Sequence, residues 1–337
     1  MNLEKSKVVI TGGTGTFGKV FLQKSLHNDI FQKLTVFSRD EYKQYLLQKE
    51  IESKFPNARV NFILGDIRDQ DRLKIAFEDA DCVINAAAMK HVPACEYNPQ
   101  EAIATNVNGA INVCNAANYC GVRKVIHLST DKAAEPINLY GATKMSAEKY
   151  MTYSNNLSNK TVYSSVRYGN IVGSRGSIVE IFSNLIHENR KLLITDDKMT
   201  RFWMSIEDAV EMVLWSLINT IGGEIIIPKI KSSKLIDIAE AICEIHDKKM
   251  SYTLTGIRPG EKIHEQLMAR SEYDRARVSN CQKYIAIPPE AADWCDNYIE
   301  KFENNYNNKF DYENYYSDNV DLLMDKEEIK HFVQNTL

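Results

Sequence analysis

The fold is decided by residues 8–18, which read Val-Val-Ile-Thr-Gly-Gly-Thr-Gly-Thr-Phe-Gly. The first four residues are all β-branched, as in a buried strand, and Gly12, Gly15 and Gly18 follow at intervals of three. A strand that enters a helix through such a turn lets the backbone approach a pyrophosphate, and the free N–H groups of the helix face the anion. The stretch therefore predicts a dinucleotide-binding turn, and the alternative is an ordinary glycine turn.

The same alternation of short apolar runs and longer helical patterns continues beyond this turn. Six runs are expected to form strands, at residues 8–11, 33–37, 60–64, 82–85, 124–129 and 162–167. Helical periodicity marks residues 17–26, 71–77, 102–118 and 139–155. This βαβ rhythm is typical of the α/β class and predicts a doubly wound, parallel sheet of the Rossmann type.

The regular alternation weakens after residue 170. Helices are expected at residues 178–188, 206–217 and 235–244, separated by short strands. We therefore predict a dinucleotide-binding domain at 1–170 and a smaller α/β lobe at 171–337, mainly for substrate, from which some chain returns to the sheet. The last forty or so residues are rich in Asn, Tyr and Asp, so we expect them to pack loosely or against a partner subunit.

Composition excludes several classes of protein. The net charge of −4 does not suit a nucleic-acid binder, and the apolar runs are far shorter than the roughly 18 to 20 residues that span a bilayer. The seven cysteines include no Cys-x-x-Cys pair and no apolar signal stretch precedes the first strand, so we expect a cytoplasmic protein. No His, Cys, Asp or Glu cluster has metal-ligand spacing, and we predict no metal.

Side chains after the second and third strands should meet the adenosine half of the dinucleotide. Ser38 and Arg39 follow the second strand, where an arginine favours the 2′-phosphate of NADP. Asp40, one position on, would instead bond the 2′-hydroxyl of NAD, and Arg39 would then be a solvated surface charge. We predict NADP, with NAD as the alternative. Asp66 and Ile67 follow the third strand, where the adenine should lie.

Three alanines, Ala86, Ala87 and Ala88, follow the fourth strand. They leave room for the cofactor ribose, although small residues that pack a helix against a sheet would look the same.

A set of side chains that could act as acids and bases follows the fifth strand, at the carboxyl edge where such folds hold ligands. Tyr140 and Lys144 are four residues apart and share one helix face, so the ammonium is expected to reach the cofactor ribose and the phenol. Lowering the pKa of a tyrosine from about 10 to about 7 takes roughly 4 kcal/mol, which one lysine and a nicotinamide cation can supply. The catalytic candidates are Thr130, Asp131, Lys132, Tyr140 and Lys144. The cofactor-binding candidates are Gly12, Thr14, Gly15, Thr16, Phe17, Gly18, Ser38, Arg39, Asp66, Ile67, Ala86, Ala87, Ala88, Tyr140 and Lys144.

These motifs resemble those of the extended short-chain dehydrogenase/reductase family. A narrower resemblance is to the inverting UDP-N-acetylglucosamine 4,6-dehydratases of pseudaminic acid synthesis, over residues 38–41, 88–93, 129–133, 136–144, 167–170, 199–203 and 256–262. It spans the chain from about residue 7 to residue 268, whereas 273–311 fits poorly and its role stays open. The resemblance implies UDP-N-acetylglucosamine as the substrate, a lyase reaction and a homo-oligomer.

The pair Asp131-Lys132 decides between reactions within that resemblance. Related dehydratases that retain configuration carry Asp-Glu there, and 4-epimerases lack such a pair. The resemblance implies that Tyr140 takes the C4 hydroxyl proton, with Thr130 sharing a hydrogen bond with that hydroxyl, while C4 gives its hydride to NADP. A neutral Lys132 then removes the C5 proton, a protonated Asp131 donates to the departing C6 hydroxyl, and hydride returns to C6.

For this role, the pKa of Lys132 must fall well below about 10.4, and Lys144 and the nicotinamide cation are expected to lower it. The alternative for the pair is an exposed loop ion pair.

Substrate contacts are expected from five residues, namely Lys90, Asn170, Arg201, Arg258 and Glu261. Arginine suits a diphosphate because its planar fork makes paired charged bonds, although each arginine alone also fits a surface ion pair. His91 fits a substrate contact or a packed, hydrogen-bonded residue equally well.

Two other functions remain open at this point. A sugar-nucleotide 4-epimerase or reductase of the same fold would use Tyr140 and Lys144 but leave Asp131 and Lys132 idle. A non-catalytic NADP-sensing protein would tolerate the loss of Lys132 and Tyr140.

Overall fold

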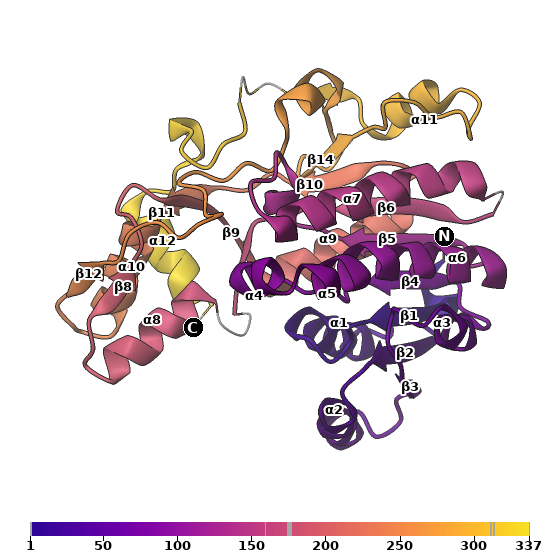
Figure 1. Ribbon diagram of the computed structural model, residues 1–337, viewed down its shortest axis with the longest axis horizontal. Coiled ribbons are helices and arrows are strands. Elements are labelled where there is room, and N and C mark those ends of the chain that lie inside the picture. The colour runs from indigo at the N-terminus through magenta and orange to yellow at the C-terminus, as the bar shows by residue number, and fades with distance from the viewer. Residues whose placement is uncertain (1, 159, 174–176, 311, 313, 337) are drawn as a thin grey trace.

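The computed structural model of the protein describes residues 2–158, 160–173, 177–310, 312 and 314–336 (Figure 1). Its strands are Lys7–Thr11 (β1), Lys33–Ser38 (β2), Val60–Leu64 (β3), Cys82–Asn85 (β4), Lys124–Leu128 (β5), Val162–Val166 (β6), Asn170–Val172 (β7), Leu192–Ile194 (β8), Thr200–Ser205 (β9), Ile225–Pro228 (β10), Ser232–Lys234 (β11), Tyr252–Leu254 (β12), Arg277–Val278 (β13), Tyr284–Ile287 (β14) and Asn308–Lys309 (β15).

The α-helices are Thr16–His27 (α1), Glu41–Lys54 (α2), Gln70–Phe77 (α3), Val92–Tyr97 (α4), Pro99–Ile103 (α5), Gly109–Cys120 (α6), Leu139–Ser154 (α7), Ile178–His187 (α8), Ile206–Asn219 (α9), Leu235–Ile245 (α10), Tyr298–Asn305 (α11) and Lys326–Gln334 (α12).

The main sheet has the strand order β15-β13-β14-β10-β6-β5-β4-β1-β2-β3. All pairs from β3 to β10 are parallel, and β14, β13 and β15 extend the sheet in antiparallel fashion. The first six strands have the order 3-2-1-4-5-6, which is that of the Rossmann fold. The predicted doubly wound parallel sheet is therefore confirmed.

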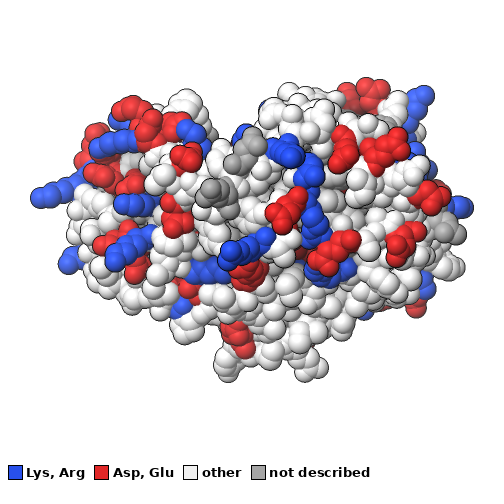
Figure 2. All heavy atoms as spheres, turned by 90° about the horizontal axis from the view of Figure 1, so that it is seen from above, with Lys and Arg blue, Asp and Glu red and all other residues white. Residues whose placement is uncertain are grey.

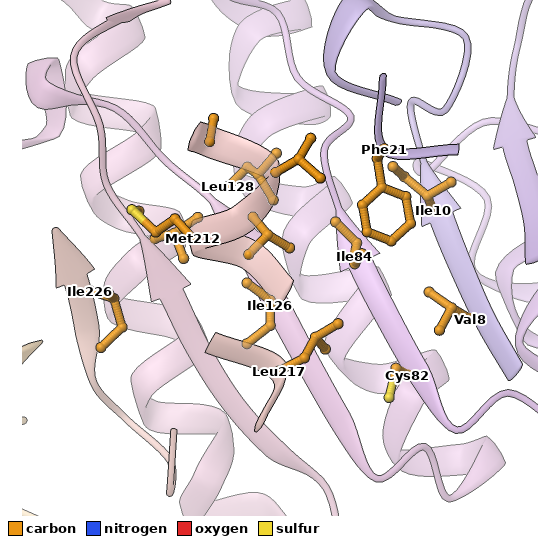
Figure 3. Packing of buried hydrophobic residues seen from close by; sticks show 14 of the residues in the cluster. Val8, Ile10, Phe21, Cys82, Ile84, Ile126, Leu128, Met212, Leu217 and Ile226 are labelled. Carbon is orange, nitrogen blue, oxygen red and sulfur yellow. The ribbon is translucent and has the colours of Figure 1, made fainter. Parts of the chain in front are cut away.

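Helices cover both faces of this sheet. Successive side chains of β1 point to opposite faces and therefore pack against different helices. Val8 and Ile10 join a core with Phe21 of α1 and Met212 of α9, as Figure 3 shows. Val9 packs on the other face, in a core that includes residues of α6 and α7. Ligands of such sheets bind at the carboxyl edge where the strand order reverses, here between β1 and β4.

A smaller lobe lies beside the sheet and contains β8, β11, β12, α8, α10 and α12 (Figure 1). Its two small sheets have the orders β11-β9-β7 and β12-β8, and its core is formed largely by α8 and α10. The chain after residue 170 is divided between this lobe and the main sheet, to which it contributes β10, β13, β14 and β15.

The C-terminal region is folded, so the expectation of a loosely packed tail is wrong. Ile329 and Val333 of α12 are buried in the core of the smaller lobe. Tyr306 and Tyr315 are fully buried against the main sheet. Composition misled here, because tyrosine contributes a large apolar ring as well as a polar hydroxyl, and because a helix of nine residues needs few apolar positions to pack.

None of the helices in the described residues is long and apolar enough to cross a membrane. Basic and acidic side chains are mixed over the face shown in Figure 2, in keeping with the small net charge.

A buried ion-pair cluster joins the residue after β6 to the preceding helix α7 and to a later segment of the chain. The guanidinium of Arg167 lies 2.7 Å from Glu148 of α7 and 2.8 Å from Glu272, and it also donates to the carbonyl oxygen of Leu267 at 3.0 Å. All three charged side chains are at least nine-tenths buried. Breaking a buried pair by removing one partner leaves an uncompensated charge, which costs far more than an exposed pair is worth.

Arg167→Leu should therefore lower the free energy of unfolding by about 3 to 5 kcal/mol, because two buried carboxylates lose their partner. The matched control is Arg190→Leu, since Arg190 pairs with Glu188 on the surface. Its expected cost is below about 1 kcal/mol. Denaturant titrations measure both values, and equal costs would contradict the role given to Arg167.

Candidate active site

The glycine turn after β1 is shaped to receive an anion. Gly12 has φ 65°, and a Cβ there would lie 2.9 Å from the backbone of Ala87. A Cβ on Gly18 would lie 2.3 Å from the carbonyl oxygen of Gly13, so α1 packs directly on the turn. Gly15 caps α1 without a side-chain hydrogen bond, so no side chain covers this end of the helix. The turn therefore fits the pyrophosphate of a dinucleotide.

The residues expected to meet adenosine lie together at the ends of β2 and β3. Arg39 is exposed, and its guanidinium is 3.5 Å from the carboxylate of Asp66. Hydrogen bonds from Arg68 outweigh burial and lower the pKa of Asp66, so this carboxylate stays ionised. Asp40 accepts a hydrogen bond from the backbone N–H of Lys43 and caps α2, an engagement that the sequence did not indicate.

The loop after β4 is fixed by a residue that the sequence analysis missed. Asn106 is buried in a π-helical turn, Ala104–Asn108, between α5 and α6. Its side chain accepts from Met89 N at 2.8 Å and donates to Met89 O and to Thr143 of α7, both at 3.0 Å. Lys90 is exposed on this loop, and His91 caps α4 through Nδ1. A π-turn often marks a functional site, which is a structural signal with no clear sequence pattern.

The acid–base residues lie in a short 3₁₀ helix, Asp131–Ala133, directly after β5. The Thr130 hydroxyl donates to Asp131 Oδ1 at 2.9 Å, and Lys132 Nζ lies 3.0 Å from the same oxygen. Lys132 Nζ is also 3.2 Å from Oε1 of Glu265, a buried residue that the sequence analysis missed. The pair Asp131-Lys132 is therefore not an exposed loop ion pair, since the Asp131 side chain is 1% exposed.

The charge state of Lys132 differs from the prediction. Burial lowers its pKa, but the carboxylates of Asp131 and Glu265 outweigh this effect, and the pKa is raised above its ordinary value. The expectation of a lowered pKa is wrong because the second carboxylate, Glu265, lies 133 residues away in the chain and could not be paired with Lys132 from local patterns. Lys132 is an ammonium in this state.

Tyr140 begins the first turn of α7, which is capped by the side chain of Asn138. Burial raises the pKa of Tyr140 to about 12, against the opposing effects of a hydrogen bond with Thr130 and the positive charge of Lys132. In this structure the cation that lowers the pKa of the phenol is therefore Lys132, and the lowered pKa expected from Lys144 is not present.

Lys144 instead takes part in a chain of buried hydrogen bonds below the site. Its Nζ donates to Leu128 O at 2.6 Å and lies 3.0 Å from Nε2 of His127. Nδ1 of His127 is 3.0 Å from the Asn85 amide, and Asn85 Oδ1 accepts from Thr11 at 2.7 Å. Burial lowers the pKa of Lys144 to about 8. The signal for His127 was a single histidine inside the apolar strand Lys124–Leu128.

The segment around residue 260 packs beside the candidate acid–base residues Asp131 and Lys132. Lys262 Nζ donates to Ala134 O at 2.8 Å, and the Asn138 side chain donates to Gly260 O at 2.7 Å. A hollow of about 480 Å³ adjoins this segment and is lined by Lys262, Ile263, His264, Asn314, Tyr316 and Asp318. The C-terminal region therefore contributes to the wall beside the site.

The remaining expected substrate residues differ in accessibility. Asn170 begins β7 and pairs with Trp203 of β9. Arg258 is exposed and 3.6 Å from Glu261. Arg201 is buried, and its guanidinium donates to the carbonyl oxygens of Thr200, Lys262 and Ile263.

Comparison with known proteins agrees with this geometry. The polysaccharide biosynthesis protein family matches residues 8–288. The chain belongs to this family. The chain is of the extended short-chain dehydrogenase/reductase type, so the resemblance inferred from the motifs is confirmed.

Two curated relatives and one solved structure illustrate the range of this polysaccharide biosynthesis family. The inverting UDP-N-acetylglucosamine 4,6-dehydratase of Campylobacter jejuni is 47% identical over 288 residues, which cover 85% of this chain and 83% of that protein. A UDP-glucose 4-epimerase of Rickettsia bellii is 38% identical over 333 residues, covering 97% and 95%. The X-ray structure of Pen from Bacillus thuringiensis is 37% identical, with a TM-score of 0.88 and coverage of 99% and 98%.

The lowered pKa of Lys144 makes a testable contribution to stability. Because its pKa falls from 10.5 to about 8 on folding, the unfolded chain binds more protons in this window. Stability from this group therefore rises with pH between about 8 and 10.5. We expect the free energy of unfolding of the wild type, relative to Lys144→Met, to increase over that window in denaturant titrations.

The control is Lys149→Met, which removes an exposed lysine from the same helix. A pH dependence for Lys144→Met no larger than that of Lys149→Met would refute the lowered pKa.

Proposed function

We propose that this chain is an inverting UDP-N-acetylglucosamine 4,6-dehydratase. The observation that carries the proposal is the ion pair between buried Asp131 and half-buried Lys132 beside Tyr140, at the carboxyl edge of the sheet. An epimerase needs a group that oxidises and reduces C4, but it has no use for an acid and a base at C5 and C6. The named activity of the Campylobacter jejuni relative supports the same choice.

The proton steps follow from the contacts at this pair. A bound nicotinamide dinucleotide supplies the hydride acceptor for C4 and the hydride donor for C6. Tyr140 acts as a phenolate after releasing its proton to solvent, and the hydrogen bond with Thr130 and the positive charge of Lys132 favour that form. The phenolate takes the proton of the C4 hydroxyl, and Thr130 hydrogen-bonds the same hydroxyl. The resulting ketone makes the C5 proton acidic.

Elimination needs one base and one acid, and one proton transfer provides both. When the Lys132 ammonium passes a proton over 3.0 Å to Asp131, Lys132 becomes an amine and Asp131 a carboxylic acid. The amine takes the C5 proton, and Asp131 protonates the departing C6 hydroxyl. Both residues then return to their original charges. Solvent then protonates C5 on the opposite face, which gives the inverted sugar, and Tyr140 releases the proton of the C4 hydroxyl to solvent.

We also propose roles for the two parts of the chain. Residues 1–170 bind the dinucleotide, and residues 171–337 mainly bind the sugar nucleotide, with Lys90, Asn170, Arg258 and Glu261 as contacts. Arg201 is proposed to contribute to the same substrate site. Because its guanidinium donates to three backbone carbonyl oxygens, we expect it to stabilise the wall of that site. The lyase reaction, a homo-oligomer, a cytoplasmic location and a step in pseudaminic acid synthesis complete the proposal. The free state of all seven cysteines supports a reducing compartment.

The decisive experiment is incubation with UDP-N-acetylglucosamine in deuterated water, followed by NMR of the product. We expect loss of water and deuterium at C5, because the C5 proton is exchanged during elimination. Tyr140→Phe is the control, since C5 cannot become acidic without oxidation at C4. Inversion at C4 without deuterium at C5 would instead establish an epimerase, as the name of the Rickettsia relative suggests.

We propose NADP as the cofactor, because Arg39 is exposed at the end of β2 while Asp40 is engaged in capping α2. Arg39→Ala should weaken NADP binding by about 10-fold to 100-fold and change NAD binding little. The control is Lys49→Ala, which removes an exposed lysine of α2 away from this end. Calorimetric titration with each dinucleotide measures the effect, and an unchanged preference would rule out this role of Arg39.

A further inference from the structure

Glu265 is held rigidly beside the acid–base pair although it comes from a distant part of the sequence. Its backbone N–H donates to the Ser317 hydroxyl at 2.8 Å, and the Ser317 N–H donates to the Glu265 carbonyl oxygen at 2.8 Å. The side chain is 2% exposed and reaches Lys132 Nζ through Oε1 at 3.2 Å. The carboxylate therefore has a fixed position relative to Lys132.

Each carboxylate of this centre keeps one oxygen without a hydrogen bond. Among the described residues, neither Asp131 Oδ2 nor Glu265 Oε2 has a partner, and both atoms are buried. Leaving a buried charged acceptor unsatisfied costs stability, and a purely structural ion pair would be expected to satisfy its oxygens. Such a cost, next to residues with shifted pKa values, points to a functional role.

The charges around Lys132 show what Glu265 contributes. The groups that face the ammonium are Asp131, Glu265 and the guanidinium of Arg201, and the Tyr140 phenol senses its charge. Arg201 Nε is 3.9 Å from Glu265 Oε1, and Lys262 also interacts with both carboxylates. Oδ1 of Asp131 accepts a hydrogen bond from the Thr130 hydroxyl as well as contacting Lys132. By contrast, Oε1 of Glu265 lies close to the two cations Lys132 and Arg201.

We propose that Glu265 is a positioning residue of the acid–base centre, which stays ionised, orients Lys132 and stabilises the ammonium that forms when Lys132 takes the C5 proton. The proposal rests on the proposed dehydratase function. It parallels the aspartate of a serine protease triad, which orients a histidine and stabilises its cation without itself becoming protonated.

The proton count is balanced with Glu265 as a constant anion. One proton passes from Lys132 to Asp131, the C5 proton passes to the Lys132 amine, and the Asp131 proton leaves with the C6 hydroxyl as water. Glu265 gains and loses none. Its charge favours the step in which Lys132 becomes positive, because a carboxylate within 4 Å stabilises a developing ammonium in a site shielded from water.

Three variants separate this role from a structural one. Glu265→Gln keeps the shape but removes the charge, and Glu265→Asp keeps the charge but moves it. Ser317→Ala is the matched control, because it loosens the same segment without changing the charge at Lys132. Thermal unfolding establishes that each variant is folded.

The first measurement is the NMR titration of Lys132 in the holoenzyme without sugar nucleotide, using lysine labelled with ¹³C at Cε. Loss of a nearby opposite charge should lower the titration midpoint of Lys132 in Glu265→Gln by about 1 to 3 pH units. Ser317→Ala and Glu265→Asp should stay close to the wild type. An unchanged midpoint in Glu265→Gln would overturn the proposal, whether or not the protein is a dehydratase.

The second measurement is the pH profile of deuterium incorporation at C5 from UDP-N-acetylglucosamine. Glu265→Gln should slow this exchange on the order of 100-fold and move the alkaline limb of the profile to lower pH, with KM and the reduction of the cofactor by C4 nearly unchanged. Glu265→Asp should recover part of the rate. Equal losses in exchange and in cofactor reduction would overturn the proposal.

The two measurements also separate the proposal from the proposed function. If the wild type releases no dehydrated product while the Lys132 midpoint still moves in Glu265→Gln, the dehydratase assignment fails and the electrostatic role of Glu265 stands.

Discussion

The geometry of the site depends on the buried guanidinium of Arg167. This group follows β6 and binds Glu148, which is on the same helix as Tyr140 and Lys144. It also binds Glu272 and the carbonyl oxygen of Leu267, two residues after Glu265. One cation thus holds the helix of the redox residues and the segment of the second carboxylate at the same edge of the sheet. A planar guanidinium suits this task because its donors point in several fixed directions.

The acid–base centre shows why that rigidity is needed. Two buried carboxylates and one ammonium are stable together only if their distances are maintained, since desolvation penalises each charge separately. Arg201 adds a second cation 3.9 Å from Glu265, and its other bonds to backbone carbonyl oxygens prevent it from turning away. In the proposed reaction, a proton can then move between Lys132 and Asp131 without a rearrangement of the surrounding charges.

Local sequence patterns were enough to predict the parallel sheet and the strand ends at which the candidate residues lie. The strands that start at Lys33 and Lys124 begin where the periodicity indicated, because burial on both faces imposes continuous apolar runs. The edge strand β3 also begins at the predicted Val60, although its residues are exposed or only partly buried. The role of Glu265 was beyond such reasoning, since its contact with Lys132 arises from tertiary packing. The missing carboxylate also explains why the pKa of Lys132 was predicted to fall, whereas it is raised. The folded tail was missed for a related reason, as its buried tyrosines gave no periodic pattern.

Two lysines of this site therefore differ in charge for a physical reason. Lys132 faces two carboxylates, which outweigh burial and keep it protonated. Lys144 is more deeply buried and meets an imidazole and a backbone carbonyl, so burial prevails and its pKa falls to about 8. The positive charge that assists the Tyr140 phenol thus comes from Lys132 in this structure. The same lysine consequently links the two halves of the proposed reaction. While Lys132 is an ammonium, its charge favours the Tyr140 phenolate that acts at C4. When Lys132 passes its proton to Asp131 for the elimination, that charge is lost.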